Sequence, residues 1–155
     1  LARAKYFASQ AVGPELERAS SCAGFAAALS LHGKVEVREA EAAQRSGDAE
    51  GAAALYGKAA RHFDAAIAAA PEFKNARFNR ALVLLKQNQV EDGVKDLQEV
   101  VTSDPSFAQA HFFLGVALEA QARAGDKSLE PKAREEFCAA FKLGMHEAKN
   151  RCGAE

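Results

Sequence analysis

Histidine and cysteine are the side chains of this 155-residue sequence that could hold a metal or attack a substrate. The four histidines, His32, His62, His111 and His146, are scattered and form no metal-ligand pattern with one another or with cysteine. The sequence contains no HExxH, no GxSxG and no glycine-rich phosphate loop. Pairs of acids such as Glu135 and Glu136 are typical of solvated helix faces. The sequence therefore predicts a protein without catalytic residues, metal or cofactor.

The three cysteines are Cys22, Cys138 and Cys152. They are few, odd in number and far apart, and none forms a CxxC pair, which makes a poor disulfide framework. We expect a reducing compartment, cytoplasm or organelle interior, and the sequence leaves that choice open. Cys22 and Cys138 are expected to be buried and inert, whereas Cys152 lies in a polar tail and is expected to be the exposed thiol.

Composition and charge exclude several classes of protein. Hydrophobic residues make up 48% and charged residues 26%, which is typical of a soluble globular fold. Twenty Lys and Arg residues balance 21 Asp and Glu residues, and this near-neutral charge argues against nucleic-acid binding as the main role. The longest apolar stretches, residues 24–31 and 65–70, are too short for a transmembrane segment.

Abundant alanine and scarce β-branched residues predict an all-α protein of antiparallel helical hairpins. Breaks at Gly47-Asp48, Pro71, Asn88, Asp104-Pro105 and Gly125-Asp126 separate the helical segments. The predicted helices cover residues 14–46, 49–70, 73–87, 90–103, 107–123 and 131–147.

Similar residues recur at an interval of 34 positions. Pro71 recurs as Pro105, and Phe63 recurs as Leu97. Further matched pairs are Phe73/Phe107, Ala76/Ala110, Phe78/Phe112, Leu84/Leu118 and Gln87/Gln121. A period of this length is typical of helical hairpins that stack into an array, since each hairpin buries an apolar face against the next.

The repeated residues resemble the tetratricopeptide repeat (TPR) family over about residues 34–145. The resemblance rests on a small residue followed four positions later by a large apolar one, as in Ala59-x3-Phe63, Gly93-x3-Leu97 and Ala133-x3-Phe137. Arg80 departs from the leucine expected at its position. The resemblance implies one helical-repeat domain over residues 1–155. Its expected parts are an N-terminal helical extension (1–33), an irregular first repeat (34–72), a second repeat (74–107), a third repeat with an insertion (108–147) and a tail (148–155).

The family resemblance implies a non-catalytic protein–protein interaction module that binds a partner's amphipathic helix or extended segment in an apolar concave groove. Such a module would serve as scaffold, assembly factor or subunit of a multi-subunit complex. The expected partner-binding residues are Asn75, Phe78, Leu82, Leu85, Lys86, Gln109, Phe112, Val116 and Glu119. In the less regular first repeat, Lys34, Val37, Glu41 and Gln44 are expected to share this face.

Two alternatives stay open at this point. The helix that starts at Pro14, or residues 1–12, could fold back and cover the groove. An RNA-binding helical repeat is the alternative function. One branch of the family clamps the C-terminal carboxylate of chaperones, and this role is disfavoured because Val37, Glu41 and Phe113 stand where the clamp needs polar or basic side chains.

Overall fold

The computed structural model describes residues 14–153, and side chains from Cys22 onward. Over this range the chain is helical and contains no strand, which confirms the predicted fold class. The elements are α2 (Pro14–Arg45), α3 (Ala49–Ala69), α4 (Lys74–Lys86), α5 (Val90–Ser103), α6 (Ala108–Ala124), a 3₁₀ turn (Lys127–Leu129), α7 (Glu130–Lys142), a 3₁₀ turn (His146–Ala148) and α8 (Lys149–Cys152).

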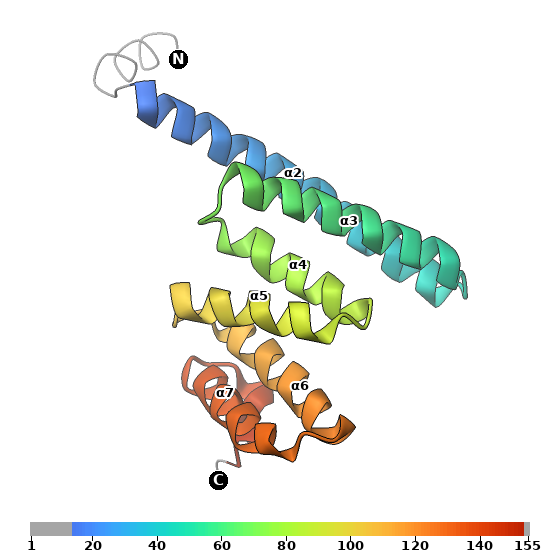
Figure 1. Cartoon of the computed structure of the whole chain (residues 1–155), viewed down its shortest axis with the longest axis vertical. Helices are drawn as coiled ribbons and strands as arrows, with labels where there is room; N and C mark the ends of the chain where they lie inside the picture. The colour runs from blue at the N-terminus through green and yellow to red at the C-terminus, as the bar shows by residue number, and fades with distance from the viewer. Residues whose placement is uncertain (1–13, 154–155) are drawn as a thin grey trace.

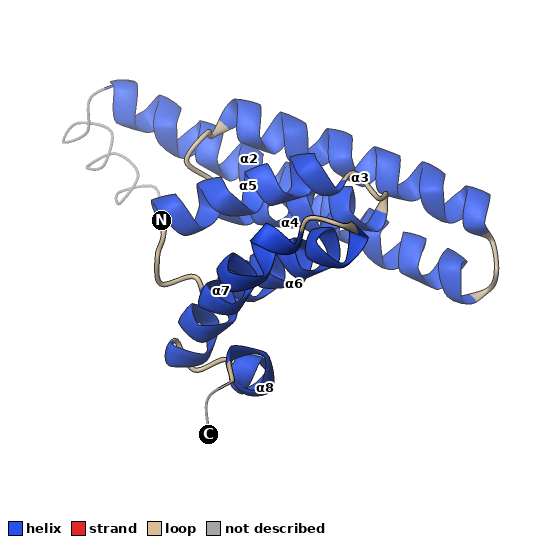
Figure 2. Cartoon of the chain, turned by 60° about the horizontal axis from the view of Figure 1, so that its bottom comes forward, coloured by secondary structure: helices blue, strands red, loops and turns tan. Residues whose placement is uncertain are grey.

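The helices stack in chain order. Helix α2 packs mainly against α3, and each of α3 to α7 packs mainly against the helix before it and the helix after it, with a smaller contact between α2 and α4 and between α4 and α6. The hairpins α2–α3, α4–α5 and α6–α7 therefore follow one another along the long axis (Figure 1). The short α8 lies beyond α7 at the C-terminal end of the stack (Figure 2).

The first helix of every hairpin ends at a residue with a left-handed backbone conformation. Gly47, Asn88 and Gly125 have φ values of 86°, 60° and 140°. At each of these ends, two backbone N–H groups reach back to carbonyls of the last turn, as in Asn88 N–H to Leu85 (3.1 Å) and Gln89 N–H to Leu84 (2.9 Å). The chain then turns sharply into the next helix, as the sequence predicted at these three positions.

The predicted last helix, 131–147, is too long. The observed α7 ends at Lys142 because Gly144 has a φ of 94° and closes the helix in the same way. Gly144 donates to the Phe141 carbonyl at 2.9 Å, and Met145 donates to the Ala140 carbonyl at 3.0 Å. The chain consequently folds back along α7 instead of continuing away from it.

This reversal overturns the prediction for the cysteines. Cys138 and Cys152 form a disulfide bond, with a Cα–Cα distance of 4.7 Å. Cys152 is half-buried, not the exposed thiol that we expected, and Cys138 is half-buried as well. Cys22 was expected to be buried but is exposed and unbonded. The pairing depends on the turn at Gly144, and sequence spacing alone did not reveal it.

Three apolar side chains occupy equivalent positions on the second helices, where we expected them to fill the spaces between adjacent hairpins. Phe63, Leu97 and Phe137 are buried, on α3, α5 and α7 respectively. A Cβ atom on Gly33 would lie 2.9 Å from the ring of Phe63, and one on Gly115 would lie 2.9 Å from the ring of Phe137. A side chain at either glycine would therefore push the paired helices apart.

Arg80, which departs from the family's leucine, holds three helices together. Its guanidinium donates to both carboxylate oxygens of Asp96 on α5, at 2.7 and 2.6 Å, and to Asp64 on α3 at 2.7 Å. The hydrogen bonds that Arg80 donates to Asp96 raise the pKa of Arg80, and burial opposes them only in part. Because Asp96 is buried, Arg80 supplies the charge that this carboxylate needs.

Replacing Phe63 tests the packing. Phe63→Ala should lower the free energy of unfolding by about 3–5 kcal/mol, because it leaves a cavity in the α2–α3 hairpin. Phe25→Ala is the matched control, since Phe25 is 61% exposed on α2. Urea titration followed by circular dichroism measures both variants. A loss well under 1 kcal/mol for Phe63→Ala would contradict the packing.

Replacing Arg80 tests the buried pair. Arg80→Met should destabilise the protein by about 3 kcal/mol at neutral pH, because it leaves the Asp96 carboxylate buried without a partner. The double variant Arg80→Met/Asp96→Leu should recover most of the loss in the same urea titration. Equal stability of the single and double variants would show that Arg80 does not compensate Asp96.

Candidate functional site

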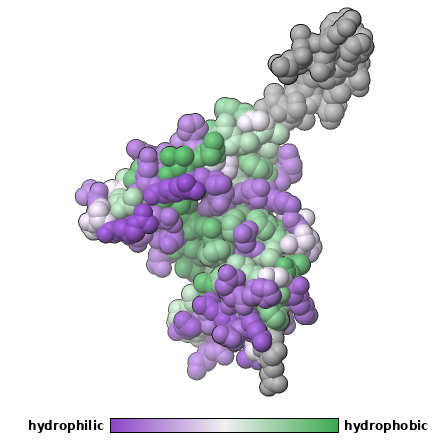
Figure 3. All heavy atoms as spheres, turned by 180° about the vertical axis from the view of Figure 1, so that it is seen from behind, coloured by the Kyte–Doolittle hydropathy of each residue, from purple (hydrophilic) through white to green (hydrophobic). Residues whose placement is uncertain are grey.

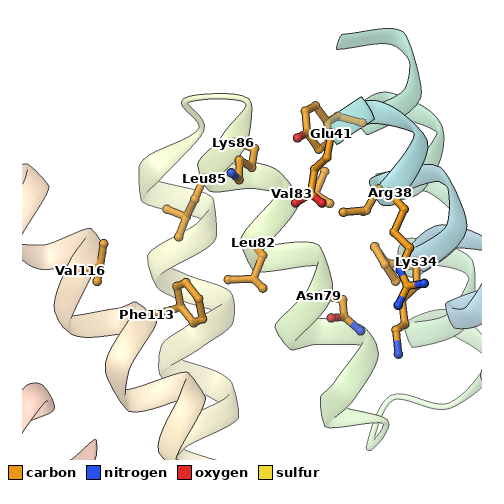
Figure 4. A pocket seen from close by; sticks show the side chains of 13 residues that line it. Lys34, Arg38, Glu41, Asn79, Leu82, Val83, Leu85, Lys86, Phe113 and Val116 are labelled. Carbon is orange, nitrogen blue, oxygen red and sulfur yellow. The ribbon is translucent and has the colours of Figure 1, made fainter. Parts of the chain in front are cut away.

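A groove lies on the concave side of the stack, where α2, α4 and α6 run side by side. Its main hollow has a volume of about 550 Å³. Tyr56, Phe63 and Val83 are buried side chains at its base. In Figure 4, Lys34, Arg38 and Glu41 reach in from α2, and Phe113 and Val116 from α6 on the other side. The side chains contributed by α4 are Asn79, Leu82, Val83, Leu85 and Lys86.

A second hollow of about 510 Å³ adjoins the first. The two share Lys34 and Asn79, so they lie next to each other along the groove. The second hollow extends along α2 to Ala27 and Leu31. Figure 3 shows hydrophobic surface gathered in the hollowed middle of one face of the molecule, between hydrophilic regions.

The structure divides the nine predicted partner-binding residues into three groups. Leu82, Leu85, Lys86 and Val116 line the main hollow. Asn75, Phe78 and Gln109 line the second hollow. Phe112 and Glu119 lie instead beside Arg151 of the C-terminal segment. Phe78 also packs against Phe107 and Phe113, with ring centroids 4.9 and 5.9 Å apart, so it supports the fold as well as the groove.

The first-repeat residues follow a similar division. Lys34, Val37 and Glu41 line the main hollow as expected. Gln44 accepts a hydrogen bond from the Tyr56 hydroxyl at 3.3 Å and lines a different hollow at the end of α2.

Six residues that line the main hollow were absent from the predicted set: Arg38, Tyr56, Phe63, Asn79, Val83 and Phe113. The sequence contained a signal for three of them. Asn79 and Phe113 are 34 positions apart and so occupy equivalent places in their repeats, and Arg38 follows Lys34 by one helical turn. Tyr56 belongs to α3, a second helix, and no such signal pointed to it.

The groove combines an apolar floor with an excess of positive charge. Lys34, Arg38 and Lys86 form no ion pair with any residue that the structure describes. Glu41 is the carboxylate among the lining side chains. Burial, and then the charge of Glu41, raise the pKa of Tyr56 above its ordinary value. The groove thus presents three cations against one anion.

The sequence left open whether the N-terminal part of the chain covers the groove, and the structure tests this for α2 but not for residues 1–12. Helix α2 packs against α3 and supplies one wall of the groove instead of filling it. Residues 1–12, the other proposed cover, lie outside the described residues. The C-terminal segment covers one end of the concave face, at Phe112 and Glu119, which the sequence did not predict.

Histidine side chains contact residues of neighbouring helices. His62 lies 2.7 Å from Glu36 and stacks on His32, and His111 lies 2.6 Å from Glu136. Within residues 14–153, no group of three or more histidine, cysteine or acidic side chains is arranged to hold a metal ion. None of the helices in that range is long and apolar enough to cross a membrane.

The fold and the sequence both match known proteins. A sequence model described as tetratricopeptide repeat matches residues 37–93 and 79–142. These segments cover more than half of the chain, and the protein belongs to the tetratricopeptide repeat family.

One curated relative is the TPR repeat-containing thioredoxin TTL4 of Arabidopsis thaliana, which is 34% identical over 76 residues. That match covers 49% of this chain but only 11% of the relative's length.

Solved TPR domains share the fold at low sequence identity. The TPR2B domain of yeast Sti1, in complex with an Hsp70 peptide, superposes with a TM-score of 0.57 at 19% identity, over 78% of this chain and 93% of that domain. The TPR domain of Arabidopsis OM64 gives a TM-score of 0.56 at 19% identity, over 79% and 95%. The first TPR domain of Spaghetti (RPAP3), bound to the HSP90 peptide SRMEEVD, gives 0.55 at 16% identity, over 81% and 94%.

Proposed function

We propose that the groove binds a segment of a partner protein that carries apolar side chains next to at least one carboxylate. The observation that carries this proposal is the apolar floor flanked by three cations without ion-pair partners in the described structure. TPR domains are in general non-catalytic interaction modules, and we extend that role to this chain.

The apolar floor provides the driving force. Leu82, Leu85, Phe113 and Val116 are half-buried, so each still has surface that a partner could cover. Burying one apolar side chain of the partner contributes about 1.5–3 kcal/mol. Several such contacts are needed, because association itself costs about 4–15 kcal/mol. A segment with two or more apolar anchors, helical or extended, meets this requirement.

The cations provide orientation and selectivity. Lys34 and Arg38 come from α2 and Lys86 from α4, so they border the apolar floor. A carboxylate on the partner would gain an attraction there, whereas a lysine or arginine would be repelled. The side-chain amide of Asn79 can donate to a partner's carbonyl and accept from its N–H. This chemistry favours an acidic segment over a basic one.

The structural neighbours support a segment of this kind. The peptide bound by the first TPR domain of Spaghetti, SRMEEVD, contains three acids beside methionine and valine. In the present chain, α6 contributes Phe113 and Val116 to the groove. A chaperone carboxylate clamp would need a basic side chain at Phe113, so we favour a segment with apolar anchors over a chaperone C-terminus. Scaffold, assembly factor and complex subunit are all roles that such binding would serve.

Affinity capture with matched variants tests the proposed function. The immobilised protein is incubated with a cell extract, and bound proteins are identified by mass spectrometry. Leu82→Asp and Arg38→Glu should each lose the groove ligand, because one removes an apolar contact and the other reverses a charge. Lys58→Glu, an exposed change on α3 outside the groove, should retain it. Circular dichroism checks that each variant is folded.

Salt dependence provides a second readout of the same experiment. Raising NaCl from about 0.05 to about 0.5 M should weaken capture by the wild-type protein, because exposed charges are screened at that ionic strength. The dependence should be smaller for Arg38→Gln, which removes this charge without reversing it. A ligand set that is unchanged by both Leu82→Asp and Arg38→Glu would show that the groove is not the binding site.

A further inference from the structure

The C-terminal segment, residues 145–153, is held against the stack by few interactions. Its helix α8 has four residues, and an isolated helix of that length is not stable in water. Ala148 is buried in the core cluster, and Met145 and Cys152 pack against that cluster. The covalent link is the Cys138–Cys152 bond, which ties the segment to α7.

The bond places Arg151 on two aromatic rings. The guanidinium carbon of Arg151 lies 5.0 Å from the centroid of Phe137 and 5.8 Å from that of Phe112, within the range of cation–π contacts. One guanidinium nitrogen lies 3.4 Å from a carboxylate oxygen of Glu119. Arg151 and Glu119 are both partly exposed, so this ion pair is weak by itself.

These contacts lie on the face of α6 that continues the groove. Phe112, Val116 and Glu119 are separated by four and three positions and so share one side of the helix. Val116 lines the main hollow, while Phe112 and Glu119 lie beside Arg151. The C-terminal segment therefore covers the end of the concave face next to the groove.

We propose that the Cys138–Cys152 bond is a redox latch that opens and closes this end of the concave face. The oxidised protein holds the segment over Phe112 and Phe137. Reduction leaves a one-turn helix attached by Ala148, Met145, the contact of His146 with Phe141 and the partly exposed contacts of Arg151, and the segment detaches. The uncovered rings of Phe112 and Phe137 then extend the apolar surface beside Val116.

A dithiol is the reductant that this chemistry requires. Its thiolate attacks one sulfur of the bond and forms a mixed disulfide, and the other cysteine leaves as a thiolate that takes up a proton. The second thiol of the reductant then displaces the first cysteine, which is protonated in turn, and the reductant becomes a disulfide. Two electrons pass from the dithiol to the cysteine pair. A disulfide oxidant such as oxidised glutathione reverses the reaction.

Hydrogen exchange on the whole protein, without any ligand, tests the latch. The protein is treated with oxidised glutathione or with dithiothreitol, and exchange is measured by mass spectrometry. The amides of Ala148 and Gly153 are bonded to the carbonyls of Met145 (3.1 Å) and Lys149 (3.2 Å). Reduction should speed exchange in the peptide that covers 145–153 by about tenfold or more, and leave α4 unchanged.

Two variants and one label sharpen the result. Cys152→Ser should exchange like the reduced protein under both conditions, and Cys22→Ser, which alters the unbonded cysteine, should respond like the wild type. A 4-fluorophenylalanine at position 112 should shift its fluorine resonance on reduction as Arg151 leaves the ring.

The proposal is wrong if oxidised glutathione leaves all three thiols open to alkylation. It is equally wrong if reduction changes neither the exchange nor the resonance. Because no ligand is used, these outcomes are independent of what the groove binds.

Discussion

The close approach of two helices within a hairpin is the constraint on which the rest of the structure depends. In the outer hairpins a glycine of the first helix, Gly33 or Gly115, faces the ring of a buried phenylalanine on the second, Phe63 or Phe137. The missing side chain sets the helix separation, and the ring fills the space that remains. Similar separations let successive hairpins stack in one register, so α2, α4 and α6 come to lie side by side. The groove is a consequence of that register, and no single residue creates it.

The two kinds of helix end are what keep the register. Helices α2, α4, α6 and α7 are each followed, one or two positions after their last residue, by a residue with a positive φ. There the backbone N–H groups bond to carbonyls of the last helical turn, and the chain reverses within a few positions. Helices α3 and α5 end just before Pro71 and Pro105, which lack the N–H needed to continue the ladder. The first kind of end makes the tight turn inside a hairpin, and the second kind separates one hairpin from the next. Gly144 forms the first kind of helix end after α7, the last long helix of the array. The chain therefore reverses there and packs against α7.

Sequence reasoning worked where the 34-residue period holds. It predicted the helix boundaries from α2 to α6 and about half of the residues that line the main hollow, because equivalent positions in stacked hairpins meet equivalent surroundings. It missed Arg38 because α2 and α3 are longer than the later helices, so the period gives no register for the first hairpin. It missed the Cys138–Cys152 bond because two residues fourteen positions apart become neighbours only after the turn at Gly144. It placed Phe112 and Glu119 on the correct face of α6 but could not foresee what covers them.

Helix α6 links the two proposals, because one face of it serves both. Val116 and Phe113 border the groove, and Phe112 and Glu119, within one turn of Val116, lie beside Arg151. A partner segment that enters over α2 and α4 would therefore end at Val116 in the oxidised protein, and it could run on over Phe112 only when Arg151 has moved. Glu119 also pairs with Arg123 of its own helix at 3.0 Å, closer than its 3.4 Å contact with Arg151, so the departure of Arg151 would still leave this carboxylate with a cationic partner. The charge that orients a bound segment would therefore remain the positive one on α2, so its acidic side chains would lie toward Lys34 and Arg38 and its apolar side chains would run on toward Phe112.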